Sequence, residues 1–340
     1  VVTGISGGVG IEAVGAAFEA GPGGAFQTVS GGSTAVGVSG NGVGTSGIVL
    51  TTVGGDLAFT DLDVYAEAGF GLSVSSTRAV NVAGGTGFRI AVGAGVGTID
   101  ANGGAAVSIQ NASANLPLAF LESTNSSGSG VLLDNAFGGA GGTTLSAATG
   151  QILDGPGSTG AAVSISGGNG DVTLAIPVTN SLGNAILVTG RTSGTISFTG
   201  AVAETGTGIQ LTSNTGATIS FSGGLTANTG ASAAFTATGG GTVVVCDENP
   251  CGATGSNGGL VNTLTTTTGT ALNVSGTTIG ANDLEFRSIS SNGGTATGSI
   301  LSATGSTGGL KVKGQGTTPG SGGTIQNKTG TDGDTATGIG

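Results

Sequence analysis

The sequence has few charged and few aromatic residues. It contains no His, Trp or Met and a single Tyr, and only 7% of its 340 residues are charged. A globular domain usually carries about a quarter charged residues. The absence of His excludes mechanisms in which imidazole acts as a base or as a metal ligand. No run of 18 apolar residues occurs, so no segment is long enough to cross a bilayer as a helix.

Basic residues are scarce as well. The chain has 18 acidic and 7 basic residues, which gives a formal net charge of −11. Nucleic-acid binding requires clustered Lys and Arg to neutralise phosphates. Attraction to an anionic membrane surface has the same requirement. The basic residues are spread too thinly for either, so we expect no nucleic-acid partner and no attraction to an anionic membrane surface. Because no apolar run is long enough to span a bilayer, we also expect no membrane insertion.

Glycine and small apolar residues dominate what remains. Glycine supplies 75 residues, and 36% of the chain is hydrophobic, mostly Val, Ile, Leu and Ala. Collagen is excluded because glycine has no three-residue period and only six prolines occur. Disordered chains combine low hydrophobicity with high charge, the opposite of this composition. The composition therefore favours a β-rich repeat.

An internal repeat is visible between residues 160 and 245. Segments with alternating apolar residues recur every 23 to 24 residues, as in Asn184–Val188 and Thr207–Leu211. A second column keeps step with the first, and a third column carries one apolar residue per repeat. The columns contain Ala161–Ile165, Asn184–Val188, Thr207–Leu211 and Ala231–Phe235; Val172–Leu174, Ile196–Phe198, Ile219–Phe221 and Val243–Val245; and Val178, Val202 and Leu225.

Three short strands per repeat predict an all-β parallel solenoid with three faces. Alternate side chains of a strand point to opposite sides, and stacked coils bury the apolar side against their neighbours. Glycine at the corners supplies positive φ. We predict two inward ladders, Ile165, Val188, Leu211 and Phe235, and Leu174, Phe198, Phe221 and Val245. We also predict an outward ladder of Thr189, Thr212 and Thr236. No composition break occurs, so we expect residues 1–340 to form one domain.

Three phrases are GTALNVSGTTIGANDLEFRSISSNG, GGTIQNKTGTDG and TGATISFSGGL, which begin at Gly269, Gly322 and Thr215. They resemble the repeats of large secreted bacterial right-handed parallel β-helix proteins, the haemagglutinin-like and autotransporter-passenger-like group. The resemblance implies a right-handed solenoid in an exported protein, secreted or on the cell surface. It also implies an adhesive or scaffolding role without nominating a ligand.

The two cysteines, Cys246 and Cys251, enclose Asp-Glu-Asn-Pro directly after Val243–Val245, the fourth segment of the second column. Tetrahedral zinc would need two further nitrogen or sulfur ligands, and the chain has no His and no third Cys. A local disulfide or two free thiols remain. An even cysteine count in a chain of exported character favours the disulfide. It would close a surface loop that carries Asp247 and Glu248 outward.

Asp61 and Asp63 are a candidate calcium site. They flank Leu62 on one expected strand, so both would face outward, and carboxylate oxygens suit Ca²⁺. We expect any such calcium to be incidental, and we expect no other cofactor.

These features favour a structural or adhesive module that is not an enzyme. Both ends of the sequence read as solenoid-like, so we expect a segment of a longer chain or a filament subunit. Its partners would be other copies stacked end to end or flanking solenoid sequence, with glycans or cell surfaces as further partners.

Two alternatives stay open. A carbohydrate-active enzyme, a polysaccharide lyase or a glycosidase, would need a groove with two convergent carboxylates and a basic residue. An ice-binding solenoid would need two parallel Thr columns on one flat face. Here the residues two positions after Thr195, Thr218 and Thr242 are Ser197, Ser220 and Val244, which breaks the second column.

Overall fold

The computed structural model describes residues 7–18, 27–76, 87–139, 142–252, 259 and 261–329. These residues form strands, turns and bends, and no helix long and apolar enough to cross a bilayer occurs among them. The chain divides into two compact units, Val1–Ile176 and Pro177–Gly340. Each unit is a right-handed parallel β-solenoid, which confirms the predicted fold class.

The strands of the first unit are β1 (Ile11–Val14), β2 (Ala17–Phe18), β3 (Gln27–Val36), β4 (Ile48–Thr51), β5 (Gly54–Gly69), β6 (Leu72–Ser75), β7 (Phe88–Val92), β8 (Thr98–Gly103), β9 (Val107–Gln110), β10 (Ser113–Ser126), β11 (Val131–Asp134), β12 (Phe137–Gly138), β13 (Thr143–Asp154), β14 (Val163–Ser166) and β15 (Asp171–Leu174).

The strands of the second unit are β16 (Val178–Asn180), β17 (Asn184–Thr189), β18 (Thr195–Phe198), β19 (Val202–Glu204), β20 (Gly208–Thr212), β21 (Thr218–Phe221), β22 (Leu225–Asn228), β23 (Phe235–Thr238), β24 (Thr242–Val245), β25 (Thr263–Thr266), β26 (Leu272–Ser275), β27 (Thr278–Phe286), β28 (Ser288–Asn292), β29 (Ser299–Ser302), β30 (Leu310–Val312) and β31 (Ile325–Gln326).

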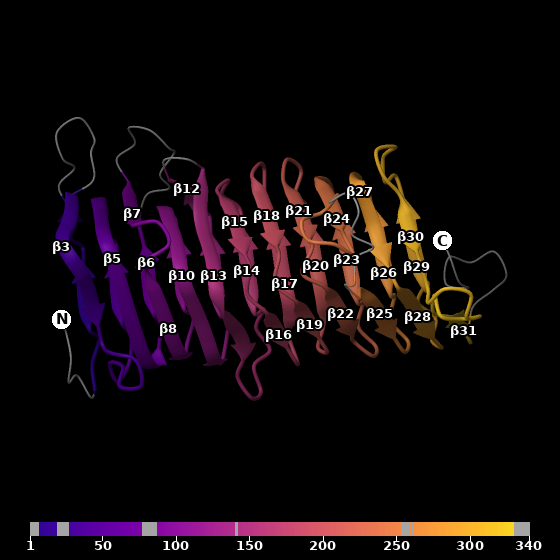
Figure 1. Cartoon of the computed structure of the whole chain (residues 1–340), viewed down its shortest axis with the longest axis horizontal. Helices are drawn as coiled ribbons and strands as arrows, with labels where there is room; N and C mark the ends of the chain where they lie inside the picture. The colour runs from indigo at the N-terminus through magenta and orange to yellow at the C-terminus, as the bar shows by residue number, and fades with distance from the viewer. Residues whose placement is uncertain are drawn as a thin grey trace. The chain divides into compact units, whose positions relative to one another are not determined.

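Each coil of the second unit has three strands, as predicted. Strand β17 pairs in parallel with β20, β18 with β21, and β16 with β19, and the same shift of three strands continues to β29, β30 and β31 (Figure 1). Stacking in this way gives each inner strand a hydrogen-bonded partner on both sides. The inward side chains of successive coils then meet one another in ladders.

One predicted ladder is confirmed within this unit. Phe198 pairs with Phe221, and Phe221 pairs with Val245; all three side chains are at most 1% exposed. The rings of Phe198 and Phe221 are stacked with their centroids 5.0 Å apart. The third column is also confirmed, since Val202 lies between Val178 and Leu225.

The other predicted ladder is wrong in its last member. Val188 pairs with Leu211, but Leu211 pairs with Ala237, and Phe235 lies opposite Ile209. The outward ladder changes with it, so that Thr212 pairs with Thr238 instead of Thr236. The turn before β23 is two residues longer than the repeat suggests. A shift of two residues keeps every side chain on its face, which is why the core tolerates it.

The first unit departs from the pattern of three short strands. Strand β5 is 16 residues long and covers two faces of its coil: Gly55–Phe59 pairs with β7, and Asp63–Gly69 pairs with β8. Strand β10 does the same against β7 and β8. The backbone bends at these corners while it remains extended. No glycine therefore marks these corners, whereas glycines mark corners between strands in the second unit.

One corner adopts the left-handed conformation in nearly every coil. The residue that follows the strand of the β1 or β17 face has φ between 50° and 78°. Glycine occupies many of these corners, as predicted, but Asn111 and Asn135 also occur, and Asn135 Nδ2 donates to Asn111 Oδ1 at 2.9 Å. Asparagine tolerates this conformation better than most residues. The corner residues are Gly15, Thr52, Asn111, Asn135 and Gly167 in the first unit, and Gly190, Ser213, Gly239, Gly276 and Ala303 in the second.

The inward ladder predicts a large penalty for a buried charge. Leu211 is 2% exposed between Val188 and Ala237, so a carboxylate at this position finds no partner among its ladder neighbours. We expect Leu211→Asp to lower the free energy of unfolding by more than about 4 kcal/mol, measured by urea unfolding. The control is Gln210→Asp, which places the same charge on the exposed side of β20. Equal effects of the two variants would contradict the ladder.

Candidate functional site

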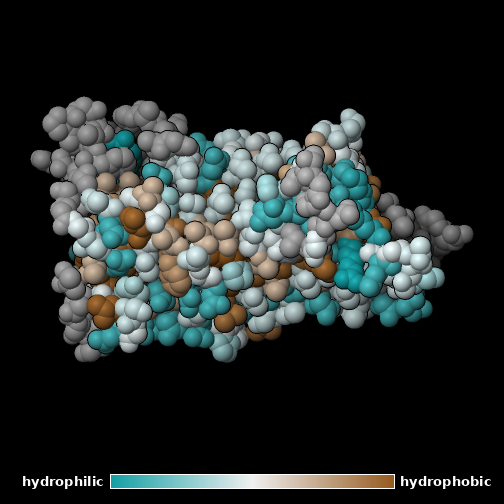
Figure 2. Space-filling view, in the orientation of Figure 1, coloured by the Kyte–Doolittle hydropathy of each residue, from teal (hydrophilic) through white to brown (hydrophobic). Residues whose placement is uncertain are grey.

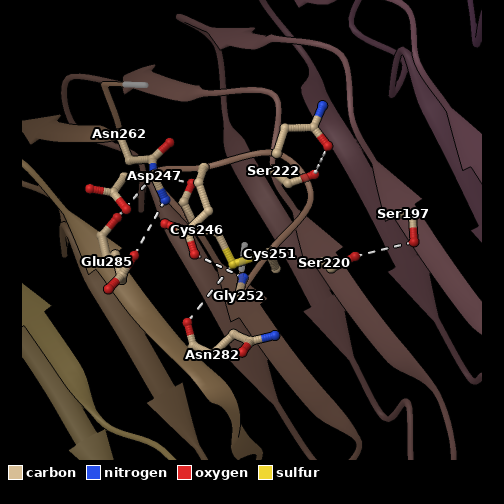
Figure 3. Close-up of a disulfide and its surroundings, with 12 residues drawn as sticks. Ser197, Ser220, Ser222, Cys246, Asp247, Cys251, Gly252, Asn262, Asn282 and Glu285 are labelled. Carbon is tan, nitrogen blue, oxygen red and sulfur yellow. Dashed lines mark hydrogen bonds between the residues drawn. A yellow bond between two sulfur atoms is a disulfide. The ribbon is translucent and has the colours of Figure 1, made fainter. Parts of the chain in front are cut away.

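A disulfide closes the turn that follows β24. Cys246 and Cys251 are bonded, with their Cα atoms 5.5 Å apart, which confirms the predicted disulfide. Cys246 is fully buried, whereas Asn249 and Pro250 at the tip are exposed. Residues 246–251 are called the disulfide loop below (Figure 3).

The disulfide loop contacts several coils of the second unit. Towards earlier coils, Asn249 Nδ2 donates to the carbonyl of Thr199, and Ser222 Oγ donates to Asn249 Oδ1, both at 3.3 Å. Towards later coils, Cys246 Sγ lies 3.8 Å from the carbonyl of Asn282. The loop therefore lies along the direction in which coils stack, instead of standing away from the surface.

Buried Asn262 anchors the start of the loop. Its amide group donates to the carbonyls of Cys246 and Glu285, at 2.8 and 2.9 Å, and its Oδ1 accepts from the amide of Leu225 at 2.8 Å (Figure 3). A side-chain amide that uses both donors and its acceptor is well satisfied in a buried position. Three coils are thereby joined through one side chain.

Asp247 does not point outward as predicted. Its side chain is 15% exposed, and its Oδ2 lies 2.8 Å from Lys313 Nζ. The Asp247 amide donates to Glu285 Oε2 at 3.4 Å. Contact with these two later coils turns the side chain back against the solenoid, and sequence spacing within the loop gave no sign of either partner.

Two facing strands supply the rest of the charged cluster. Asp283, Glu285 and Arg287 alternate along and just beyond β27, and Lys311, Lys313 and Gln315 alternate along and beyond β30. The register places Glu285 opposite Lys311. Lys311 Nζ lies 2.5 Å from Asp283 Oδ2, Lys313 Nζ lies 3.2 Å from Glu285 Oε1, and Arg287 Nη2 donates to Gln315 Oε1 at 2.7 Å.

The cluster shifts the pKa values of its members. Burial raises the pKa of Asp247, but hydrogen bonds with Glu285, Lys313 and Glu248 outweigh burial and leave that pKa below its usual value. The hydrogen bond with Asp247 raises the pKa of Glu248. The Lys311 ammonium lowers the pKa of Asp283, and Asp283 in turn raises the pKa of Lys311.

Three carboxylates of this cluster lie close enough together to be considered as metal ligands. Within the described ranges, Asp247, Glu248 and Glu285 are the one set of three acidic groups with ligand atoms all within 4.8 Å. The Lys313 ammonium, however, lies against both Asp247 and Glu285. A positive charge of the protein itself thus stands where a bound cation would stand.

Asp61 and Asp63 lie on β5 on either side of buried Leu62, as the sequence suggested. Ser33 Oγ donates to Asp63 Oδ2 at 2.6 Å. The two carboxylates do not belong to the set of three just described. Calcium binding by Asp61 and Asp63 stays a prediction.

A cavity of about 360 Å³ adjoins the charged cluster, with Asp247, Glu285, Arg287 and Lys313 in its lining. Glycosidases hold their two carboxyl groups about 5 to 10 Å apart to make room for the sugar or a water. Asp247 and Glu285 are closer than this and share Lys313 between them. Their geometry fits an ion-pair network that links neighbouring coils better than it fits a catalytic pair.

Sequence reasoning missed Glu285, Lys311 and Lys313 as members of this site. They lie 26 to 66 residues away along the chain from the groups they contact. The signal that would have found them is the pairing of Leu284 with Leu310, which sets Asp283-x-Glu285 opposite Lys311-x-Lys313. The repeat that is visible in the sequence ends at residue 245, so it gives no register for these two strands.

Comparisons of this chain with models of known protein families, with characterised proteins and with solved structures give no match.

The disulfide predicts the thiol content of the protein. We expect no reactive thiol in the denatured, unreduced chain and both of its two cysteines to react after reduction, as measured with a thiol reagent. Because the loop is short, reduction should lower the free energy of unfolding by less than the roughly 3 kcal/mol expected for a 15-residue loop. Two thiols in the unreduced chain would refute the disulfide.

The Asp283–Lys311 pair predicts a pH dependence. A carboxyl with a lowered pKa stabilises the fold above its unfolded pKa, about 3.9, and that stabilisation is lost as pH falls through the folded pKa. Lys311→Met should therefore lower the urea midpoint at neutral pH and lose this effect as the pH falls through the folded pKa of Asp283.

The matched control is Lys328→Met. Lys328 Nζ donates to the carbonyls of Gly269 and Gly293, which do not titrate. The effect of Lys328→Met on the urea midpoint should therefore persist at acid pH, because neither carbonyl partner is protonated there. A loss of stability in Lys311→Met that stayed equal from neutral to acid pH would contradict the ion pair.

Proposed function

We propose that this chain is an extracellular structural and adhesive β-solenoid that extends by β-stacking with another copy or with flanking solenoid sequence. The observation that carries the proposal is the edge formed by β29, β30 and β31. Each of these strands has one partner strand, on its inner side, among the residues that the structure describes. A parallel strand with a free edge is a template for another strand.

Apolar side chains accompany that edge. Leu301, Leu310 and Ile325 are partly exposed, and Val312 is 43% exposed. Together with Ile289 they line a cavity of about 390 Å³. In earlier coils the same inward positions are buried by the coil that follows. Covering them with a further coil would remove apolar surface from water, which favours stacking.

The outer surface supports an adhesive role. Ser197 and Ser220 are joined by a hydrogen bond of 3.2 Å, and Thr189 and Thr212 by one of 3.1 Å. Columns of short hydroxyl side chains offer donors and acceptors at the spacing of the coils. This chemistry suits contact with glycans or with the surface of a neighbouring solenoid.

The disulfide supports a location outside the cytoplasm, since such bonds persist in oxidising compartments. The resemblance to haemagglutinin-like and autotransporter-like bacterial surface proteins points the same way. Both are consistent with a secreted or surface-displayed protein.

Neither alternative gains a specific observation. For the enzyme, the convergent carboxylates of the charged cluster are spaced too closely and are neutralised by lysines. For ice binding, the column Thr195, Thr218, Thr242 and Thr278 is continuous, but the column two residues on contains Ser197, Ser220 and the buried Val244. The non-enzymatic proposal is therefore retained.

Stacking at the β29–β31 edge predicts concentration-dependent assembly. We expect wild-type protein to form larger species in sedimentation velocity, and fibres by electron microscopy, as its concentration rises. Val312→Lys should suppress assembly at least about tenfold, because a charge on an edge strand opposes further pairing.

The matched control is Leu182→Lys, since Leu182 is 48% exposed but lies in a turn outside this edge. It should assemble like the wild type. A wild-type chain that stays monomeric at every concentration, and that binds no flanking solenoid sequence, would contradict the stacking proposal.

A further inference from the structure

A groove of about 500 Å³ crosses successive coils of the first unit at one corner. It lies where β5 turns into β6, where β8 turns towards β9, and where β10 turns towards β11. Ser46, Phe70, Ala105, Ser127, Ser129 and Leu132 are among its lining residues. Figure 2 shows that apolar surface gathers among polar surface over the coils of this unit.

Glycine keeps the groove open. At Gly104 glycine is required by packing, since an added Cβ would lie 2.5 Å from the carbonyl carbon of Gly69 in the preceding coil. Gly128 is different: an added Cβ would meet no atom within 4 Å, and its φ is not left-handed. Neither stacking nor backbone conformation requires glycine there. What its missing side chain does is leave the space of the groove free.

The lining combines an aromatic face with hydroxyl groups. Phe70 is 40% exposed, although most large apolar side chains of the described residues are buried. Its amide donates to Ser46 Oγ at 3.1 Å, which fixes the backbone at the rim. Gly128 N donates to Ser126 Oγ, and Ser126 Oγ donates to the Ser129 carbonyl, so the opposite rim is ordered too. The side-chain hydroxyls of Ser127 and Ser129 make no hydrogen bond within the described part of the chain.

The groove carries no charge. None of its lining residues is acidic or basic, although the chain as a whole has a net charge of −11. A metal ion or a cationic ligand would find no carboxylate in the lining. An anionic ligand would find no Lys or Arg and would meet the negative field of the protein. The electrostatics therefore select a neutral ligand.

We infer that this groove binds a neutral glycan. A pyranose ring has an apolar C–H face that stacks on an aromatic side chain and an edge of hydroxyl groups that hydrogen-bond to serines. The groove offers both in the same place, Phe70 on one side and the Ser127–Ser129 rim on another. It crosses coils that rise by about 4.8 Å each, so an extended oligosaccharide, rather than a single sugar, fits along it. This inference rests on the proposed adhesive function and gives it a ligand class.

The test uses the complete 340-residue chain. Binding of cellotetraose, maltotetraose and mannotetraose would be measured by calorimetry, with oligogalacturonate as the anionic counterpart and chitosan oligomers as the cationic one. We expect one or more neutral tetrasaccharides to bind. Gly128→Leu, which fills the groove, and Phe70→Ala, which removes the stacking face, should each weaken binding at least about tenfold.

Matched controls come from the same unit. Gly54→Leu also adds a side chain where no atom lies within 4 Å, and Leu153→Ala truncates another apolar side chain that is 40% exposed. Both should bind like the wild type. The thermal midpoint of all four variants would be measured beside binding, because Phe70 and Leu153 are partly buried. A variant with a lowered midpoint would be replaced by Gly128→Gln or by Phe70→Leu, which keeps apolar volume but removes the aromatic face.

Three outcomes would overturn the inference: no neutral oligosaccharide binds, only the charged oligomers bind, or Gly128→Leu retains full affinity. Assembly of the same sample is followed by sedimentation. If the chain assembles and adheres to surfaces without binding glycan, the glycan-binding inference is wrong and the proposed structural role stands. If the chain binds glycan but neither assembles nor adheres, the proposed structural role is wrong and the glycan-binding inference stands.

Discussion

Every part of this protein depends on the hydrogen bonding of each strand to the equivalent strand one coil away. A single coil of about two dozen residues has no interior of its own; its apolar edge is buried only when coils stack. The stacked rings of Phe198 and Phe221 and the packed Val188 and Leu211 are products of that pairing. Charged residues are rare because only the outward side of each strand can hold them without a partner. The unusual composition and the fold thus have one cause.

The fold was largely predictable from periodicity. Alternation inside each strand gives the inward and outward sides, and the 23 to 24-residue repeat gives the pairing of Phe198 with Phe221 and of Val202 with Leu225. The register between Leu211 and Ala237 was not predictable, because a two-residue change in a turn leaves the alternation intact. The long strand β5 was missed for a related reason: an extended backbone that bends at a corner leaves no glycine to mark it.

The site was less predictable than the fold. The disulfide followed from two cysteines and the character of the chain, and it is present. The direction of Asp247 was not foreseen, because Lys313 and Glu285 approach it from later coils and their distance depends on turn lengths. In a solenoid, neighbours in space are one repeat apart in sequence. A small error in the assumed period therefore makes the predicted side-chain contacts wrong, while the predicted strands remain right.

The disulfide loop has a mechanical consequence. A solenoid pulled along its stacking direction would be expected to lose coils one at a time from an end, since each coil holds only its neighbours. The disulfide loop contacts Thr199 and Ser222 on one side and Asn282, Glu285 and Lys313 on the other. These contacts join coils that are not direct neighbours along the stack. We therefore expect load applied at one of these coils to be shared with the others, so that this stretch of the second unit resists tension as a block.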